Sequence, residues 1–259
     1  VAVWAWNTAL ALVAGNSVVW KPSEKTPLTA LACQALFEKA LKAFGDAPAG
    51  LSQLVIGGRE AGEALVDDPR VPLVSATGST RMGREVGPRV AARFGRSILE
   101  LGGNNAMILA PSADLDLAVR GILFSAVGTA GQRCTSLRRL IVHKSIHAEL
   151  VERLTKAYAS LPIGDPRKST TLIGPLVDHG SRDRMLAQIE KAKADGGRVH
   201  GGTTVTEGVP QGGAYVTPAL IEMPAQTDTV REETFAPILY VLAYDDFEEA
   251  LRLNNEVPQ

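Results

Sequence analysis

Cysteine and histidine are scarce in this sequence, and their scarcity excludes two kinds of site. Cys33 and Cys134 are the only cysteines among 259 residues. Two cysteines give no disulfide framework and favour a reducing compartment, so we expect a cytoplasmic protein. The four histidines are scattered, without a cysteine or acidic partner at ligand spacing. The sequence therefore predicts no metal site.

The net charge is also small. It is −1 by formal count, and Lys and Arg are dispersed along the chain. A surface for nucleic acid or an anionic membrane needs clustered basic residues, so we expect neither partner. Residues 1–20 carry no charge, but they lack a basic leading region and are interrupted by Asn7 and Asn16. A buried helix followed by a buried strand fits them better than a signal or membrane segment.

Helical patterns and short apolar runs alternate over the first hundred residues. The predicted helices are residues 2–14, 27–44, 60–66 and 80–94, and the predicted strands are residues 17–21, 51–56, 71–76 and 97–101. This alternation is typical of a parallel sheet covered by helices on both faces. We therefore expect a Rossmann-like α/β domain over residues 1–102, which would be the cofactor domain.

Gly102 and Gly103 form the predicted domain boundary. A second α/β domain, which would carry the thiol chemistry, is expected over residues 103–259. Its predicted strands are residues 106–109, 138–143, 215–221 and 238–244, and its predicted helices are residues 114–127, 146–161, 181–194 and 247–254. One more short strand is expected between the two glycine pairs at residues 196–197 and 201–202.

The Gly-x-Gly-x-x-Gly pattern of many dinucleotide-binding proteins is absent. Residues 76–83 (Ala-Thr-Gly-Ser-Thr-Arg-Met-Gly) instead join a predicted strand to a predicted helix. Amides at a helix N-terminus favour a phosphate, although an ordinary cap at Ser79 explains the same residues. A similar junction follows the preceding strand, and two such junctions fit the ligand crevice of an open sheet. The glycines at the two junctions are Gly58, Gly62, Gly78 and Gly83.

Two charged residues, Lys21 and Glu24, follow a predicted buried strand. A carboxylate there would accept hydrogen bonds from ribose hydroxyls and repel a 2′-phosphate, which favours NAD over NADP. Solvated loop charges explain the same two residues equally well.

Cys134 differs from Cys33 in its surroundings. Cys33 lies on an apolar helix face, where we interpret it as a small buried hydrophobic residue. Cys134 follows a run of small residues and is preceded by Arg133. A thiol nucleophile needs a means to become thiolate, and its acyl adduct needs a base to activate water. Glu100 ends an apolar run, 34 residues before Cys134. We expect burial at this position to disfavour the ionised form of its side chain, as suits such a base.

Several segments together resemble the aldehyde dehydrogenase superfamily. They are residues 21–24 (Lys-Pro-Ser-Glu), 77–80 (Thr-Gly-Ser-Thr), 100–103 (Glu-Leu-Gly-Gly), 131–135 (Gly-Gln-Arg-Cys-Thr) and 233–237 (Glu-Thr-Phe-Ala-Pro). Their order is that of the family, and the resemblance covers the whole chain. Arg133, together with residues 102–106 (Gly-Gly-Asn-Asn-Ala) and 235–238, is most similar to the α-aminoadipic semialdehyde, or antiquitin-type, branch.

The resemblance implies an NAD-dependent oxidation of an aldehyde, in which Cys134 is the nucleophile and Glu100 the base. It also implies that Glu233 binds the nicotinamide ribose and that Phe235 packs against the nicotinamide. Arg133 allows two interpretations. In the first, its charge favours the thiolate or points outward. In the second, its guanidinium binds a carboxylate of the substrate. The remaining residues implied to contact the cofactor are Lys21, Glu24, Gly58, Gly62, Gly78, Ser79, Gly83 and Leu101, and Thr135 is implied to contact the substrate.

Other functions stay open beside this one. One is a CoA-acylating semialdehyde dehydrogenase, which Glu100 disfavours because CoA would replace water. Another is a cysteine hydrolase or acyltransferase that needs no dinucleotide, and a third is a binding role without turnover. The family's second oxyanion donor, an asparagine, would precede Val1, so we expect an internal fragment of a longer protein that forms homodimers or homotetramers.

Overall fold

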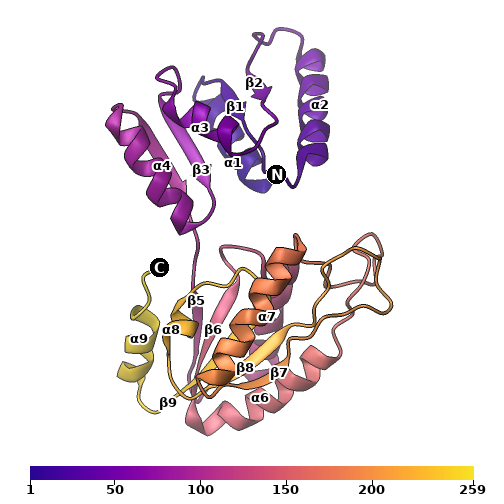
Figure 1. The fold of residues 1–259 in the computed structure, drawn as a ribbon, viewed down its shortest axis with the longest axis vertical. Helices are drawn as coiled ribbons and strands as arrows, with labels where there is room; N and C mark the ends of the chain where they lie inside the picture. Colours follow the sequence, from indigo (N-terminus) through magenta and orange to yellow (C-terminus); the bar gives the residue numbers. More distant parts are fainter. The chain divides into compact units, whose positions relative to one another are not determined.

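The computed structural model describes residues 1–259, which divide into two compact units, Val1–Leu101 and Gly102–Gln259. Both units alternate helices with strands, and all strand pairs but one are parallel (Figure 1). The predicted α/β class is therefore confirmed. None of the helices combines the length and the apolarity that crossing a bilayer requires.

The first unit contains every helix and strand predicted for it, with ends displaced by no more than two residues. They are α1 (Ala2–Val13), β1 (Val18–Trp20), α2 (Pro27–Phe44), β2 (Ser52–Leu54), α3 (Arg59–Asp67), β3 (Leu73–Thr77), α4 (Thr80–Ala92) and β4 (Arg96–Glu100). Pro27 starts α2 at a position where no intrahelical N–H is needed. Gly45 ends it with a φ of 88°, which glycine adopts without strain.

The sheet of the first unit differs from the prediction of one sheet covered on both faces. Its strands form two separate parallel pairs, β1 with β2 and β3 with β4. Few of its apolar side chains are buried, and Val13 and Phe94 are 92% and 98% exposed. The predicted burial of residues 1–20 is likewise wrong, because Thr8 is the one buried residue of α1. Each of these strands has a single neighbour, and a two-stranded sheet presents little surface for helices to cover.

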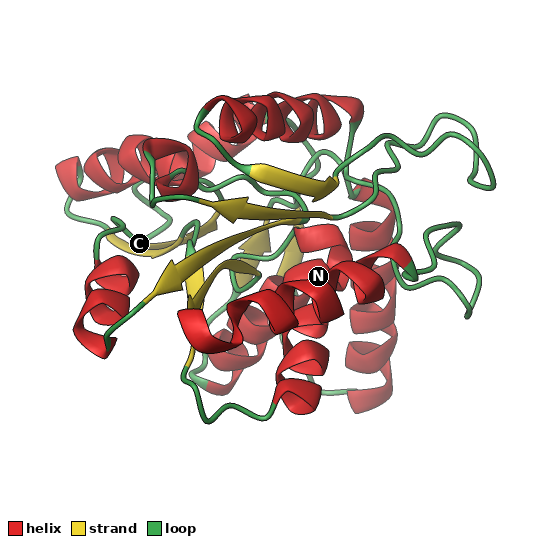
Figure 2. Cartoon of the chain, turned by 90° about the horizontal axis from the view of Figure 1, so that it is seen from below, coloured by secondary structure: helices red, strands yellow, loops and turns green.

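The second unit is a five-stranded sheet with the strand order β5-β6-β9-β8-β7. Its elements are β5 (Asn105–Leu109), α5 (Leu115–Val127), the 3₁₀ turn η1 (Gly128–Gly131), β6 (Leu137–His143), α6 (Lys144–Ala159), α7 (His179–Ala194), β7 (Arg198–Gly201), β8 (Ala219–Met223), α8 (Asp228–Arg231), β9 (Ile238–Tyr244) and α9 (Phe247–Asn255). Only β7 runs antiparallel to its neighbour. Two long loops, residues 160–178 and 202–218, are joined by a bridge between Leu176 and Ala214. Figure 2 distinguishes the loops, in green, from the helices and strands.

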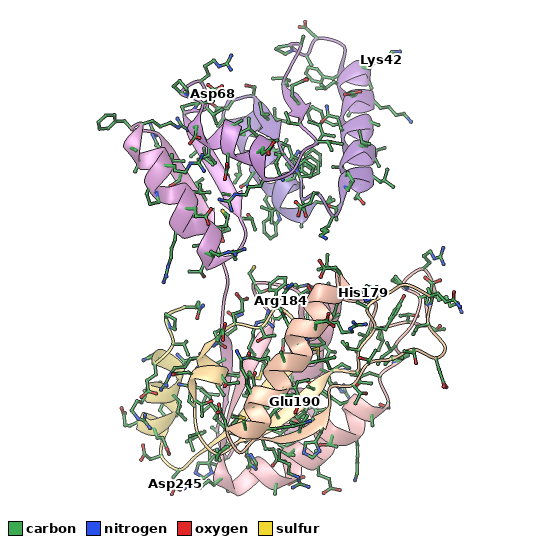
Figure 3. The ribbon with its side chains drawn as sticks, in the orientation of Figure 1. Lys42, Asp68, His179, Arg184, Glu190 and Asp245 are labelled. Atoms are coloured by element: carbon green, nitrogen blue, oxygen red, sulfur yellow. The ribbon has the colours of Figure 1, made fainter.

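The hydrophobic core lies within the second unit. Strands β6, β8 and β9 are almost fully buried, and side chains of α5, α6 and α7 pack against them. Central parallel strands need cover on both faces, which explains their continuous apolar runs. The amphipathic helix predicted for residues 181–194 is confirmed as α7. Its outer face carries polar and charged side chains, among them His179, Arg184 and Glu190 (Figure 3).

One strand of the second unit was predicted in the wrong place. The apolar run at residues 215–221 predicts a strand there, but β8 begins at Ala219 and ends at Met223. Pro218 explains the shift, because proline has no N–H to donate to a ladder. The strand between the glycine pairs is confirmed as β7, whereas η1 and α8 were not predicted.

Candidate active site

The segment before Cys134, residues 129–132, has a strained backbone and is held in place by hydrogen bonds. Thr129, Ala130 and Gly131 have φ values of 53°, 54° and 66°, three successive residues in the left-handed region. That region costs an L-residue about 1–2 kcal/mol. Gln132 holds the segment, since its Nε2 donates to the Thr129 carbonyl at 3.1 Å and its Oε1 accepts from the Val177 N–H at 2.8 Å. Strain that surrounding contacts maintain is common at functional sites.

Cys134 presents both its thiol and its backbone N–H. The residue is exposed, and its N–H donates to no protein acceptor. Its carbonyl, in contrast, accepts from Asn105 Nδ2 at 2.7 Å. The preceding carbonyl, that of Arg133, accepts from the Ser136 N–H at 3.1 Å and from Arg138 Nη2 at 3.1 Å. A free N–H beside an exposed thiol can stabilise the oxyanion that forms when the sulfur attacks a carbonyl.

Arg138, on the buried strand β6, connects the thiol segment with the loop before β9. Its side chain is 3% exposed. Besides Arg133, it donates to the carbonyls of Gly131 at 3.1 Å and Ala236 at 3.2 Å. Its Nη2 lies 3.5 Å from Glu233 Oε1, an ion pair too long for a good hydrogen bond. Burial lowers the pKa of Arg138, and the nearby Glu233 carboxylate opposes that shift.

Glu233 and Phe235 border this cluster. Arg138 Cζ lies 5.4 Å from the centre of the Phe235 ring, within the range of a cation–π contact, and Phe235 is 48% exposed. Glu233 Oε1 is buried and receives no hydrogen bond. The carboxylate lies so close to Gly102 that a Cβ there would collide with it. The Glu233 side chain is still 16% exposed, so its carboxylate keeps some access for a ligand hydroxyl, which fits the ribose role that the resemblance implies.

Close backbone contact explains why residue 131, three positions before Cys134, is a glycine. A Cβ on Gly131 would lie 2.6 Å from the Ala236 carbonyl carbon, so only glycine lets the two segments approach. The structure thus brings together the predicted residues Cys134, Glu233 and Phe235 within the second unit, with Arg138 between them.

Arg133 and Thr135, the predicted substrate contacts, flank Cys134 and are exposed. The Arg133 guanidinium makes no hydrogen bond or ion pair within the protein. It is therefore free to pair with an anionic ligand.

In the first unit, Lys21 lies over the junction between β2 and α3. Its Nζ donates to the Gly57 carbonyl at 3.2 Å and lies 3.9 Å from the Glu24 carboxylate. A Cβ on Gly62 would lie 3.6 Å from the Lys21 side chain, and Gly58 is the N-cap of α3 with open space around it. Lys21, Glu24, Gly58 and Gly62 are thus brought together.

The second junction is equally well defined. Ser79 caps α4 and accepts from the Met82 N–H at 3.2 Å, which confirms the predicted cap. The Gly78 N–H donates to the Glu100 carbonyl at 2.9 Å, so the turn is attached to the end of β4. The predicted residues Gly83 and Leu101 are in contact, since a Cβ on Gly83 would lie 2.6 Å from the Leu101 side chain.

Two predictions of burial at the candidate site are wrong. Glu100 was expected to be buried at a strand end, but its side chain is exposed, because β4 pairs on one side only. Cys33 was interpreted as a buried residue and is instead half-buried on α2.

Sequence reasoning missed the residues that hold the site. They are Asn105, Gln132 and Arg138. Two adjacent arginines within the otherwise apolar strand β6 were a usable signal, because arginine is seldom buried without a specific partner. No group of three or more His, Cys, Asp or Glu side chains could hold a metal ion.

Known proteins resemble this chain over its whole length. A model of the aldehyde dehydrogenase family matches residues 1–259. A Caenorhabditis elegans homologue of aldehyde dehydrogenase family 7 member A1 is 50% identical over 261 residues, covering 100% of this chain and 48% of that protein. The Bos taurus α-aminoadipic semialdehyde dehydrogenase is 45% identical over 260 residues, with coverage of 100% and 48%. The chain therefore spans about half the length of these relatives.

A solved structure is similar as well. The betaine aldehyde dehydrogenase of Staphylococcus aureus, crystallised in complex with NAD+, matches with a TM-score of 0.90 and 30% identity. The match covers 97% of this chain and 50% of that one.

Proposed function

This chain belongs to the aldehyde dehydrogenase family, and from that premise we propose that it carries the thiol and dinucleotide sites of an enzyme that oxidises an aldehyde with NAD. The observation that carries the proposal is Cys134. Its thiol is exposed and its backbone N–H unpaired, and Arg138 connects its segment to the loop of Glu233 and Phe235.

In the proposed reaction the Cys134 thiolate attacks the aldehyde carbon, and a carbon–sulfur bond forms. The carbonyl oxygen takes up negative charge, and the Cys134 N–H donates a hydrogen bond to it. A nicotinamide dinucleotide held beside Glu233 and Phe235 would supply the two-electron acceptor that oxidation of this adduct to a thioester requires. Glu100 then takes a proton from water, the water attacks the thioester, and the acid and the thiolate are released.

Residues of both units support the cofactor part of the proposal. The carboxylate of Glu233, whose side chain is 16% exposed, would accept from a ribose hydroxyl, and the half-exposed Phe235 ring would pack against the nicotinamide. The N-terminus of α4, capped by Ser79, suits a phosphate. Lys21 and Glu24 would hold the second ribose, and the Glu24 carboxylate would repel a 2′-phosphate, which favours NAD over NADP.

The proposed substrate is an aldehyde that also bears a carboxylate, such as α-aminoadipic semialdehyde. The unpaired guanidinium of Arg133 directly precedes the nucleophile, and planar guanidinium groups bind carboxylates with two parallel hydrogen bonds. Thr135 exposes a hydroxyl on the other side of Cys134. The similarity to the bovine enzyme named for this semialdehyde supports the same choice.

The test is the absorbance of reduced nicotinamide after a carboxylated semialdehyde is added to the protein with NAD or with NADP. We expect turnover with NAD, faster than with NADP, and none in Cys134→Ser. Cys33→Ser is the matched control and should keep its activity. Turnover that requires CoA, thioester hydrolysis without any dinucleotide, or activity that survives in Cys134→Ser would each contradict the proposal.

A further inference from the structure

We propose that Arg138 is a positioning residue that directs the Cys134 N–H toward the reacting oxygen and holds the thiol segment against the Glu233–Phe235 loop. The effect that we expect on turnover rests on the proposed function. The effect that we expect on the position of the thiol segment rests only on contacts within the second unit.

The first step is the direction of the Cys134 N–H. The Arg133 carbonyl and the Cys134 N–H belong to one peptide unit, which is planar and trans, so the two groups point in opposite directions. Arg138 Nη2 holds that carbonyl at 3.1 Å. The N–H is therefore directed away from Arg138 and left without an acceptor. Because a cationic donor polarises the peptide it binds, the same contact makes this N–H a better donor.

The peptide on the other side of Cys134 is held differently. Its carbonyl accepts from Asn105 Nδ2 at 2.7 Å, and Asn105 also donates to the Ser136 carbonyl at 2.9 Å. Both peptide planes that flank the nucleophile are thus fixed by side chains. Of the two, only Arg138 also contacts the loop before β9.

The second step is the link to that loop. One guanidinium donates to the carbonyls of Gly131 and Ala236, faces the Glu233 carboxylate and lies over the Phe235 ring. The planar fork of arginine can reach acceptors on two segments at once, whereas the single ammonium of lysine cannot hold the same set. Arg138 should therefore fix the spacing between the thiol and the groups proposed to hold the nicotinamide ribose.

The neighbouring arginine provides a matched control. Arg139 is also buried on β6, but successive side chains of a strand point to opposite faces. It donates to the carbonyls of Asn104 at 2.8 Å and Leu253 at 2.7 Å and contacts no residue of the thiol segment. Arg138→Lys and Arg139→Lys each remove a buried fork and keep the charge, so both should lower the melting temperature.

The experiment compares the two variants with the unaltered protein in hydrogen exchange and in kinetics. Arg138→Lys should speed amide exchange in peptides covering residues 128–137 and 231–237. It should also lower kcat/KM for the aldehyde by roughly ten- to a hundredfold, the size expected for slight misplacement of reacting groups, and raise KM for NAD. Arg139→Lys should leave both kinetic parameters within about twofold, because Arg139 donates no hydrogen bond to the thiol segment or to the Glu233–Phe235 loop.

The outcomes separate this inference from the proposed function. Unchanged exchange of residues 128–137 and 231–237 in Arg138→Lys would overturn the positioning role, whether or not the protein turns over. Equal kinetic losses in Arg138→Lys and Arg139→Lys would overturn it too, because they would reflect general destabilisation. If exchange responds as expected while the unaltered protein does not oxidise aldehydes with NAD, the proposed function fails and the structural part of the inference stands.

Discussion

Replacing Arg133 by alanine tests whether this side chain recognises a carboxylate on the substrate. The guanidinium is exposed, directly precedes the nucleophile and has no partner within the protein. Its removal should therefore leave the fold intact, because exposed substitutions away from structural contacts change stability by only about 0.5 kcal/mol. Any large effect on turnover would then come from lost contact with the substrate.

The exposure of Arg133 limits the size of the effect. A hydrogen bond to a charged group contributes about 1.5–3 kcal/mol. Solvent screens an exposed pair, which shifts the expected contribution toward the lower value. Since about 1.4 kcal/mol corresponds to a factor of ten, kcat/KM for a carboxylated semialdehyde should fall about tenfold, and by no more than about a hundredfold.

The assay measures kcat/KM for a carboxylated semialdehyde and for an unbranched aldehyde of the same length. Arg133→Ala should lose activity on the first and keep it on the second, and the loss should shrink at high salt. Arg133→Lys retains the charge without the planar fork and should recover part of the activity. Arg120→Ala, at another exposed arginine, is the control. Equal losses on the two aldehydes would refute carboxylate recognition.

Three further predictions concern stability. Arg139→Met should lower the free energy of unfolding by about 3 kcal/mol or more, because Met cannot replace the buried hydrogen bonds that the guanidinium donates to the Asn104 carbonyl and to Gln226 Oε1; a denaturant midpoint close to that of the unaltered protein would contradict this. Phe94→Gly should raise stability by about 0.5–1 kcal/mol, since Phe94 is 98% exposed at a φ of 59°, and a lower melting temperature would count against it. Hydrogen bonds from Arg167 lower the pKa of Asp165 to about 2. The ionised carboxylate therefore contributes stability above about pH 4 that is lost as the pH falls through about 2. Asp165→Asn should flatten the acid unfolding curve in that window, and an unchanged curve would disprove the link.

Secondary structure could be predicted where a local rule decides it. Pro27 and Gly45 delimit α2 as expected, and the apolar run at Ile238–Tyr244 forms β9 without displacement. The strand near Pro218 was misplaced because ladder hydrogen bonding outweighs the apolar pattern. The pairing of strands and the exposure of Glu100 depend on neighbours far away in the sequence, which a reading along the chain does not supply.

The candidate site was predictable to a similar extent. Chemistry singles out Cys134, because a lone cysteine among small residues beside a cation is recognisable as a candidate nucleophile. Arg138 was missed because its contacts are backbone carbonyls of Gly131, Arg133 and Ala236. A carbonyl is present at every residue, so no residue type in the sequence marks these partners. Residues that orient a site are for this reason harder to find than those that react.

The most direct test of the central claim is the mass of the protein during turnover in the Glu100→Gln variant. With the base removed, the thioester formed from aldehyde and NAD should hydrolyse slowly and accumulate. We predict one acyl group per chain, located by peptide mass spectrometry on Cys134, and an equal burst of reduced nicotinamide. An acyl group on Cys33, or a burst of reduced nicotinamide with no covalent adduct at all, would contradict the account.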